Sequence, residues 1–219
     1  MNAHDVLDVI RKVGIIPVIR AASAADAILA AEAMKEGGIP VVEITMTVPG
    51  AIEVIRKVSQ EFASDVLIGA GTVTTAAQAA DCLEAGAEFL VSPGLCISVL
   101  RVAQSKNKLA LPGALTPSEL IVAMEAGAHA IKIFPCGSVG GPKYLKALRG
   151  PFPNAALIPT GGVNAGNAAQ YFESGAFAIG VGGELVNAAA LRAGRKQEVA
   201  DAARELVAVV QAARTGHNP

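Results

Sequence analysis

The chain has 219 residues, of which 52% are hydrophobic and 17% are charged, with a formal net charge of -1. Its length suits one large α/β domain or two small ones, and its near-neutral charge gives no reason to expect nucleic acid or an anionic membrane as a partner. The first residues, Met1-Asn2-Ala3-His4-Asp5, lack the basic-then-apolar order of a signal peptide, and no apolar run approaches the length of a membrane span. Cys82, Cys96 and Cys136 are spaced too widely for a disulfide framework. We therefore expect a cytoplasmic protein.

Short β-branched strands alternate with helices along the whole chain. A leading amphipathic helix is predicted because Val6, Val9, Ile10 and Val13 fall on one helical face. Strands are predicted at residues 15–19, 41–45, 66–70, 88–91, 109–111, 130–133, 156–159 and 177–181, and the last helix at about 195–213. Helix starts are predicted at Ser23, at Thr75 with Gln78, at the capping box Thr116-Pro117-Ser118-Glu119, and at Asn164.

Eight strand–helix units in this length predict a single closed (β/α)₈ (TIM) barrel, with the leading helix as an addition at the N-terminus. The barrel is expected to occupy residues 1–214. Residues 215–219 are expected to form a short C-terminal tail.

A short internal repeat aligns alternate strands. Four tetrapeptides with glycine third, each ending a helix, begin at Glu36, Glu84, Glu125 and Glu173. Seven residues beyond these glutamates stand Glu43, Val91, Lys132 and Gly180. Because each interior layer of such a barrel takes side chains from alternate strands, Glu43 and Lys132 are predicted to share one layer, in which Gly180 leaves a hole.

Lys132 lies in the apolar run Ile131-Lys132-Ile133, where an ammonium ion is costly to bury. Either the charge is paired, or the amine is kept partly neutral and acts as a nucleophile towards a carbonyl group. With Glu43 moving protons, the two residues would support Schiff-base chemistry. The alternatives are a strand-end lysine that reaches solvent and a buried ion pair that only fills the barrel.

Other candidates follow the strands. Arg20 ends the first strand and could hold a substrate carboxylate, or be an ordinary surface arginine. The loops with Gly161-Gly162 and Gly182-Gly183 follow the last two strands, where barrels often bind phosphate, although glycine pairs also make plain turns. Thr72 could donate to a ligand or belong to a plain turn. No metal-ligand pattern is present among the scattered histidines, and Cys136 is interpreted as a packed residue.

The chain resembles the bacterial 2-keto-3-deoxy-6-phosphogluconate (KDPG) aldolases, also called 4-hydroxy-2-oxoglutarate (KHG) aldolases. The resemblance is carried by Ile16-Pro17-Val18-Ile19-Arg20, Val42-Glu43-Ile44-Thr45, Gly69-Ala70-Gly71-Thr72-Val73, Leu90-Val91-Ser92-Pro93-Gly94, Leu111-Pro112-Gly113, Ile131-Lys132-Ile133-Phe134-Pro135, Leu148-Arg149-Gly150-Pro151-Phe152-Pro153 and Pro159-Thr160-Gly161-Gly162-Val163. It implies a metal-independent class I aldolase of the Entner–Doudoroff route that needs no cofactor and assembles as a homotrimer.

The resemblance also implies roles for single residues. Lys132 would form the Schiff base and Glu43 would be the general acid/base. Arg20, Thr72 and Pro93 would line the pyruvate pocket, Phe134 and Thr160 would form its walls, and the loops at Gly161-Gly162 and Gly182-Gly183 would receive the distal phosphate. The substrate would be KDPG, giving pyruvate and glyceraldehyde 3-phosphate, or KHG, giving pyruvate and glyoxylate.

Two positions depart from the family pattern. Thr47 stands where the phosphogluconate enzymes have an arginine, and Glu184 where the final loop usually has serine. These departures keep open 2-keto-3-deoxy-6-phosphogalactonate or an unphosphorylated keto acid as substrate. Two other functional classes remain as alternatives. One is a phosphosugar isomerase or epimerase that uses Glu43 as base, and the other is a non-catalytic barrel that senses an oxo acid.

Overall fold

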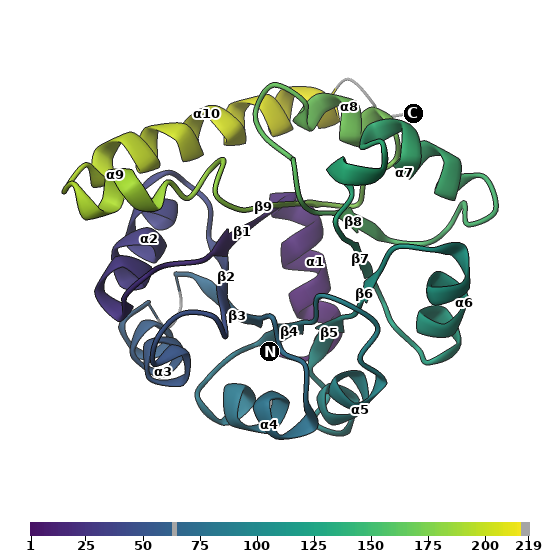
Figure 1. The fold of residues 1–219 in the computed structure, drawn as a ribbon, viewed down its shortest axis with the longest axis horizontal. Coiled ribbons are helices and arrows are strands. Elements are labelled where there is room, and N and C mark those ends of the chain that lie inside the picture. The colour runs from purple at the N-terminus through teal and green to yellow at the C-terminus, as the bar shows by residue number, and fades with distance from the viewer. Residues whose placement is uncertain (63–64, 216–219) are drawn as a thin grey trace.

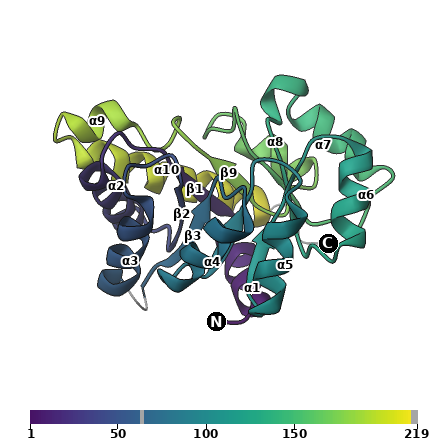
Figure 2. The ribbon, with the colours of Figure 1, turned by 60° about the horizontal axis from the view of Figure 1, so that its bottom comes forward.

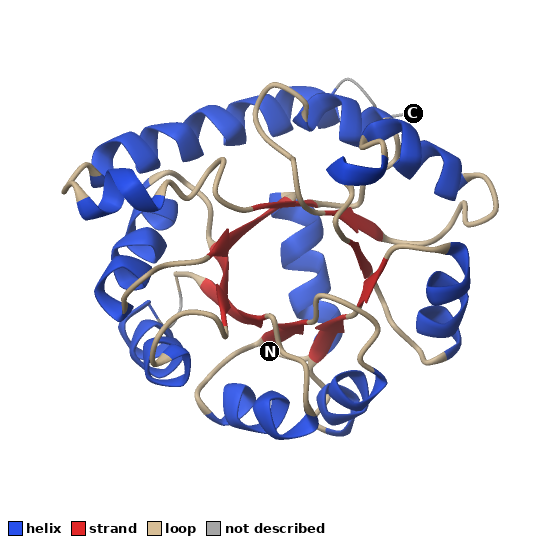
Figure 3. Cartoon of the chain, in the orientation of Figure 1, coloured by secondary structure: helices blue, strands red, loops and turns tan. Residues whose placement is uncertain are grey.

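The computed structural model describes residues 1–62 and 65–215 and shows a ring of short parallel strands inside a layer of helices (Figures 1 and 3). The strands are β1 Ile15–Ile19, β2 Val41–Thr45, β3 Leu67–Gly71, β4 Phe89–Val91, β5 Leu109–Leu111, β6 Gly113–Ala114, β7 Ile131–Ile133, β8 Leu157–Pro159 and β9 Ile179–Val181. The helices are α1 Ala3–Val13, α2 Ala24–Glu36, α3 Ala51–Phe62, α4 Ala76–Glu84, α5 Ile97–Ser105, α6 Pro117–Glu125, α7 Pro142–Arg149, α8 Ala168–Glu173, α9 Ala188–Arg192 and α10 Lys196–Thr215, with a 3₁₀ turn, η1, at Gly137–Val139.

The strands form two parallel sheets that follow each other around the ring, ordered β5-β4-β3-β2-β1-β9 and β6-β7-β8. A backbone bridge between Thr160 and Gly180 connects the end of β8 to β9. On the other side β5 and β6 are separated by Pro112 alone, which has no N–H to donate, so together they fill one strand position of the barrel. The predicted (β/α)₈ barrel is confirmed.

Alternate residues of the strands point into the ring and form one apolar cluster with α1. The residues of this inner cluster that lie in the strands, or directly before them, are Ile16, Val41, Leu67, Phe89, Val91, Leu109, Leu111, Ala130, Ile158 and Ala178. Val6 and Ile10 of α1 belong to the same cluster. Helix α1 therefore closes the amino-terminal end of the barrel and leaves the carboxyl ends of the strands for a site (Figure 2).

The predicted repeat is visible in the backbone. The third residue of each tetrapeptide, Gly38, Gly86, Gly127 and Gly175, has a positive φ between 83° and 105°. Glycine adopts this left-handed conformation without a steric penalty, so each of these helices can stop abruptly and pass into a strand. The repeat thus sets equal lengths before β2, β4, β7 and β9, which places Glu43, Val91, Lys132 and Gly180 at equivalent positions.

The predicted helix starts at Ser23 and Thr116 are confirmed, the latter as a full capping box with Glu119. Thr75 also caps its helix, but the predicted reciprocal bond of Gln78 is wrong, since its side chain accepts from Thr74. The prediction at Asn164 is wrong as well. Helix α8 begins at Ala168, and Asn164 instead accepts from the amide of Gly166 in the turn before it.

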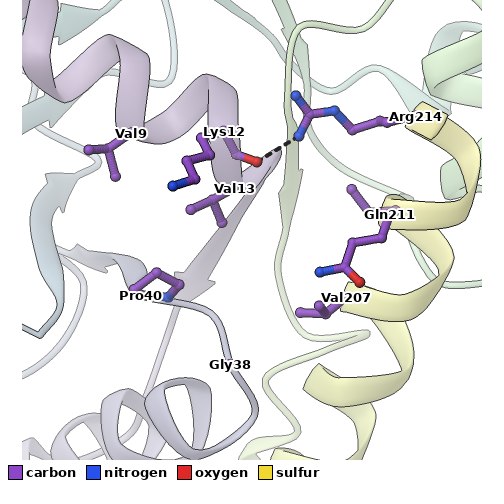
Figure 4. Close-up of a pocket in the computed structure, with 9 residues that line it drawn as sticks. Val9, Lys12, Val13, Gly38, Pro40, Val207, Gln211 and Arg214 are labelled. Carbon is purple, nitrogen blue, oxygen red and sulfur yellow. Dashed lines mark hydrogen bonds between the residues drawn. The ribbon is translucent and has the colours of Figure 1, made fainter. Parts of the chain in front are cut away.

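Near the chain end, α10 reaches Thr215, one residue past the predicted boundary, and residues 216–219 of the predicted tail lie outside the described residues. The C-terminal half of α10 and α1 border a pocket of about 380 Å³ at the amino-terminal side of the ring (Figure 4). Arg214 crosses this pocket and donates to the carbonyl groups of Arg11 and Lys12. No helix in the described ranges is long and apolar enough to cross a membrane.

Candidate active site

Lys132 and Glu43 face each other inside the barrel, from β7 and β2. The Lys132 Nζ atom lies 3.8 Å from Glu43 Oε1, and the two residues are only 3% and 2% exposed. The prediction that both side chains share one layer is therefore confirmed. The strand-end alternative, in which Lys132 reaches solvent, is wrong because the strand keeps its side chain inside the ring.

Glu43 Oε1 is the one buried side-chain oxygen or nitrogen in residues 1–62 and 65–215 that has no hydrogen-bond partner. Its 3.8 Å separation from the ammonium group is too long for a direct hydrogen bond. An unsatisfied buried acceptor lowers the stability of the fold by on the order of 1–3 kcal/mol. An ion pair that served stability alone would therefore not be expected to leave this oxygen unsatisfied. The free acceptor is available to a ligand or a water molecule that enters between the two side chains.

Glycine at position 71 makes room for the Glu43 carboxylate. A Cβ atom on Gly71 would lie 2.5 Å from both Cγ and Cδ of Glu43, well inside the ordinary contact distance. The next residue, Thr72, is half-buried and has a φ of 58°, an uncommon conformation for a threonine. Thr72 thus directly follows the glycine that Glu43 packs against, at the carboxyl end of β3.

Pro93 lies against Gly113, the residue that pairs with Lys132 on the neighbouring strand. Its carbonyl carbon would be in contact with any side chain at Gly113, and Gly113 pairs with Lys132 in the parallel ladder. The buried Ser92 hydroxyl donates to the Gly94 carbonyl and accepts from the Gly113 amide, which fixes the loop that contains Pro93. The carbonyl end of this loop is therefore held against the strand next to Lys132.

A pocket of about 280 Å³ opens at the carboxyl end of the barrel and gathers most of the predicted binding residues. It is lined by Val18, Arg20, Phe134, Thr160, Gly161, Gly162, Val163, Gly182, Gly183 and Glu184. Phe134 connects this pocket to the lysine, because its ring centroid lies 5.3 Å from Lys132 Nζ. Lys132, Glu43, Thr72 and Pro93 are not among the residues that line the pocket. Lys132 and Glu43 are buried inside the barrel, next to Phe134.

The predicted hole at Gly180 is absent, and that prediction is wrong. The Thr160 side chain occupies the space, since a Cβ atom on Gly180 would lie about 3 Å from the Thr160 methyl group and closer still to its hydroxyl. Thr160 is 6% exposed and follows β8, beside β9. The absence of a side chain at Gly180 therefore leaves room for the Thr160 side chain, which lines the pocket.

Two residues that shape the site were missed by sequence reasoning. Thr45 lies two residues after Glu43 on the same inner face, and its buried hydroxyl donates to the Ile19 carbonyl, which ties β2 to the strand end before Arg20. Ser92 is the other. The period-two alternation of the strands could have signalled Thr45, whereas the contact of Ser92 depends on loop geometry.

Thr47, the position of the first departure, is exposed. Its hydroxyl lies 2.7 Å from that of Thr45. Because the Thr45 proton is directed to Ile19, Thr47 is the donor of this bond and has no second proton to offer an anion. The Thr47 side chain therefore supplies neither a charge nor a free hydroxyl proton to the site.

Cys136 is buried, and burial raises the pKa of its thiol to about 11. A thiol with such a pKa forms little thiolate near neutral pH, which agrees with its interpretation as a packed residue. The neighbouring Tyr171 is also buried, and the pKa of its phenol is raised to about 12, chiefly by burial. Neither group is poised for acid–base work in this region.

Comparisons with known proteins agree with this geometry. The family model described as "KDPG and KHG aldolase" matches residues 6–202. A 2-dehydro-3-deoxy-phosphogluconate aldolase of Dickeya dadantii is 38% identical over 194 residues, which are 89% of this chain and 91% of that protein.

Two solved structures are also similar. The KDPG aldolase of Legionella pneumophila, with pyruvate captured as a covalent carbinolamine, matches with a TM-score of 0.85 and 33% identity over 91% of this chain and 97% of that one. A protein cage designed by fusing symmetric oligomeric domains matches with a TM-score of 0.86 and 30% identity over 94% of this chain and 74% of that one. The chain therefore belongs to the KDPG and KHG aldolase family and is a lyase of the class I, Schiff-base type.

Proposed function

We propose that the chain cleaves a 2-keto-4-hydroxy acid into pyruvate and an aldehyde through a Schiff base on Lys132. The observation that carries this proposal is the buried pair of the Lys132 amine and the Glu43 carboxylate. Lys132 Nζ and Glu43 Oε1 lie 3.8 Å apart, and Oε1 has no hydrogen bond. Both groups lie at the carboxyl ends of barrel strands, where barrel enzymes have their active sites.

The reaction follows from these two groups. The Lys132 amine attacks the C2 carbonyl carbon to give a carbinolamine, which loses water to give an iminium ion. Glu43 accepts the proton of the C4 hydroxyl as the C3–C4 bond breaks and its electron pair moves towards the iminium nitrogen. The aldehyde departs, the enamine is protonated at C3, and water releases pyruvate from Lys132.

Binding roles are proposed for the remaining residues. Arg20 holds the substrate carboxylate with its fork of donors, and Thr72 and Pro93 contact the pyruvate part of the substrate. Phe134 and Thr160 form the walls of the pocket. The loops at Gly161-Gly162 and Gly182-Gly183 contact the distal part, which is supported by their common position around the 280 Å³ pocket.

KDPG and KHG are the substrates proposed first, since the family description and the Dickeya relative name compounds of this class. Cleavage gives pyruvate with glyceraldehyde 3-phosphate or with glyoxylate. The phosphogalactonate isomer and an unphosphorylated keto acid are the alternatives, because all of them share the 2-keto-4-hydroxy unit that the two catalytic residues act on.

Reductive trapping tests the proposal directly. Pyruvate with borohydride is expected to leave a reduced pyruvyl group on Lys132, located by peptide mass spectrometry, and to abolish cleavage activity. Lys132→Ala is expected to lose both the label and the activity. An unlabelled Lys132 would refute the Schiff base, and high turnover in Lys132→Arg would favour an isomerase or epimerase with Glu43 as base.

A homotrimer in the cytoplasm is also proposed. Three large apolar side chains are exposed on α6, namely Ile121, Val122 and Met124, and Val139 of η1 is exposed as well. Exposed apolar side chains support burial against another copy, in line with the oligomeric domains of the similar cage chain.

Cys82, Cys96 and Cys136 are all free thiols, which supports a reducing compartment.

A further inference from the structure

The pocket of about 380 Å³ between α1 and α10 lies at the amino-terminal end of the barrel, away from the proposed active site (Figure 4). Its volume falls within the range of about 300–1,000 Å³ that is usual for small-molecule sites. At roughly 30 Å³ for each non-hydrogen atom, the share of a water molecule in the liquid, it has room for about a dozen such atoms. The pocket is therefore large enough for a small organic ligand.

One part of the pocket wall is apolar. It consists of four valines and a proline from three separate segments: Val9 and Val13 of α1, Pro40 before β2, and Val207 and Val210 of α10. Val9, Val13 and Val207 are only partly buried, so they stay in contact with solvent unless another molecule covers them. Covering these side chains favours a ligand with an apolar body.

The same pocket contains two cationic side chains and one amide. Lys12 lies on the α1 side, and Gln211 and Arg214 lie on the α10 side (Figure 4). Within residues 1–62 and 65–215, neither Lys12 nor Arg214 forms an ion pair with a carboxylate, and the Gln211 side chain makes no hydrogen bond. The positive charge of the pocket is therefore unpaired in this part of the chain.

Arg214 is held in place before any ligand binds. Its guanidinium group donates to the carbonyl of Lys12 at 2.8 Å and to that of Arg11 at 2.6 Å, in the last turn of α1. Gly14 leaves room for this approach, because a Cβ atom there would lie 2.8 Å from Nη1 of Arg214. The carbonyl groups are neutral and use only part of the N–H donors, so the charge and the remaining donors are available to the oxygens of a carboxylate.

A ligand that matches both parts of the wall has an apolar body and one negative charge. Lys12 and Arg214 repel a cation, a neutral compound leaves their charges unused, and a polyphosphate has no apolar part to cover the valines. We propose that this pocket is a second binding site, which takes a monocarboxylate with a compact apolar body. The site is independent of the proposed aldol cleavage at the other end of the barrel.

Binding at this site is expected to stabilise the closed end of the barrel. The ligand contacts α1 and α10 together, and Val6 and Ile10 on another face of α1 belong to the cluster that fills the barrel. A ligand of the folded state raises the midpoint of thermal unfolding by mass action. The unfolding midpoint is therefore a second readout beside direct titration.

The test uses benzoate, benzamide and benzamidinium, which have nearly the same size and shape but carry a negative charge, no charge and a positive charge. Calorimetric titration of the unmodified chain at pH 7 is expected to give a Kd of about 1 mM for benzoate. Benzamide is expected to bind about tenfold more weakly, and benzamidinium is expected to show no saturable binding at the same concentrations. Of these probes, only benzoate is expected to raise the unfolding midpoint clearly.

Two variants disrupt the site in different ways. Lys12→Gln removes one charge and is expected to weaken benzoate binding about fivefold, a moderate effect because Lys12 is exposed. Val207→Phe fills the pocket from a partly buried position on α10 and is expected to abolish benzoate binding. The unfolding midpoint of each variant without ligand shows that it is folded.

Two matched controls remove a positive charge elsewhere. Arg20→Gln removes the cation of the 280 Å³ pocket at the carboxyl end of the barrel. Lys146→Gln removes an exposed lysine of α7 that forms no ion pair within the described residues. Each control is expected to change the Kd of benzoate less than twofold.

Three outcomes overturn the inference. Equal affinities for benzoate and benzamide would show that charge plays no part in binding. Benzoate binding that survives both Lys12→Gln and Val207→Phe, or that is lost in Arg20→Gln, would place the ligand in another site. The absence of saturable benzoate binding by the unmodified chain at about tenfold the expected Kd would show that the pocket does not take this class of ligand.

Discussion

Gly71→Ala is expected to disable the site without unfolding the barrel. The added Cβ atom would lie 2.5 Å from Cγ and Cδ of Glu43, and ordinary contact begins at 3.4 Å, so the carboxylate has to retreat by at least about 0.9 Å. A misplacement of about 1 Å in a catalytic group costs on the order of 100-fold in rate. We therefore expect kcat for pyruvate release to fall about 100-fold.

The same overlap costs stability, because extra volume in a packed interior is worth roughly 1–3 kcal/mol of unfolding free energy. Urea unfolding is the measurement, alongside initial rates with KDPG and with 2-keto-3-deoxygluconate. Gly94→Ala is the control, since a Cβ atom there has no neighbour within 4 Å and its backbone is not left-handed. It is expected to keep its unfolding free energy within about 0.5 kcal/mol of the unmodified chain.

The reasoning would be refuted if Gly71→Ala kept full kcat, because the Glu43 carboxylate would then not need its present position. A large loss of stability with normal kcat would be equally contrary. It would mean that the strand, and not the carboxylate, had moved to accommodate the methyl group.

Two further predictions concern titrating groups. Burial raises the pKa of the Cys82 thiol to about 12 and that of the Cys136 thiol to about 11. At pH 8 iodoacetamide is therefore expected to label the partly exposed Cys96 well before either of them, as followed by peptide mass spectrometry. Fast labelling of Cys136 in the folded protein would contradict its packing. The backbone amides of Leu115 and Thr116 lower the pKa of Glu119, so its stabilising effect is present above the ordinary carboxyl range and is lost as the pH falls through the lowered pKa. Glu119→Gln is expected to cost under about 1 kcal/mol of unfolding free energy at pH 7 and progressively less as the pH is lowered into the acid range, and a cost that does not change with pH would show that the charge has no part.

The sequence was sufficient to predict the barrel and its central pair because both depend on periodicity. Equal spacing from four helix ends placed Glu43 and Lys132 at the same height, and strand alternation then decides which side chains face inward. The strands were predicted at nearly their observed positions, except that β6 at Gly113–Ala114 was not predicted at all. Two residues after a proline are too short a segment for a pattern to reveal.

What remained hidden depends on contacts between chain segments that are distant in sequence. The gap at Gly180 is filled by Thr160, and only the adjacency of β8 and β9 shows this. The left-handed conformation of Thr72 is equally invisible, since threonine disfavours it and the turn after β3 imposes it. The failed prediction at Asn164 has a local cause, because asparagine stabilises turns as readily as helix starts.

The closure of the barrel by α1 sets an order on the proposed reaction. Val6 and Ile10 fill the amino-terminal end beneath the central pair, so substrate enters and both products leave through the same mouth. Pyruvate is the part attached to Lys132, at the inner end, and the aldehyde lies between it and the solvent. The aldehyde therefore departs first, and pyruvate blocks Lys132 until the Schiff base between them is hydrolysed. Free pyruvate is then a competitive inhibitor of cleavage, and in the direction of synthesis the aldehyde is the second reactant to bind.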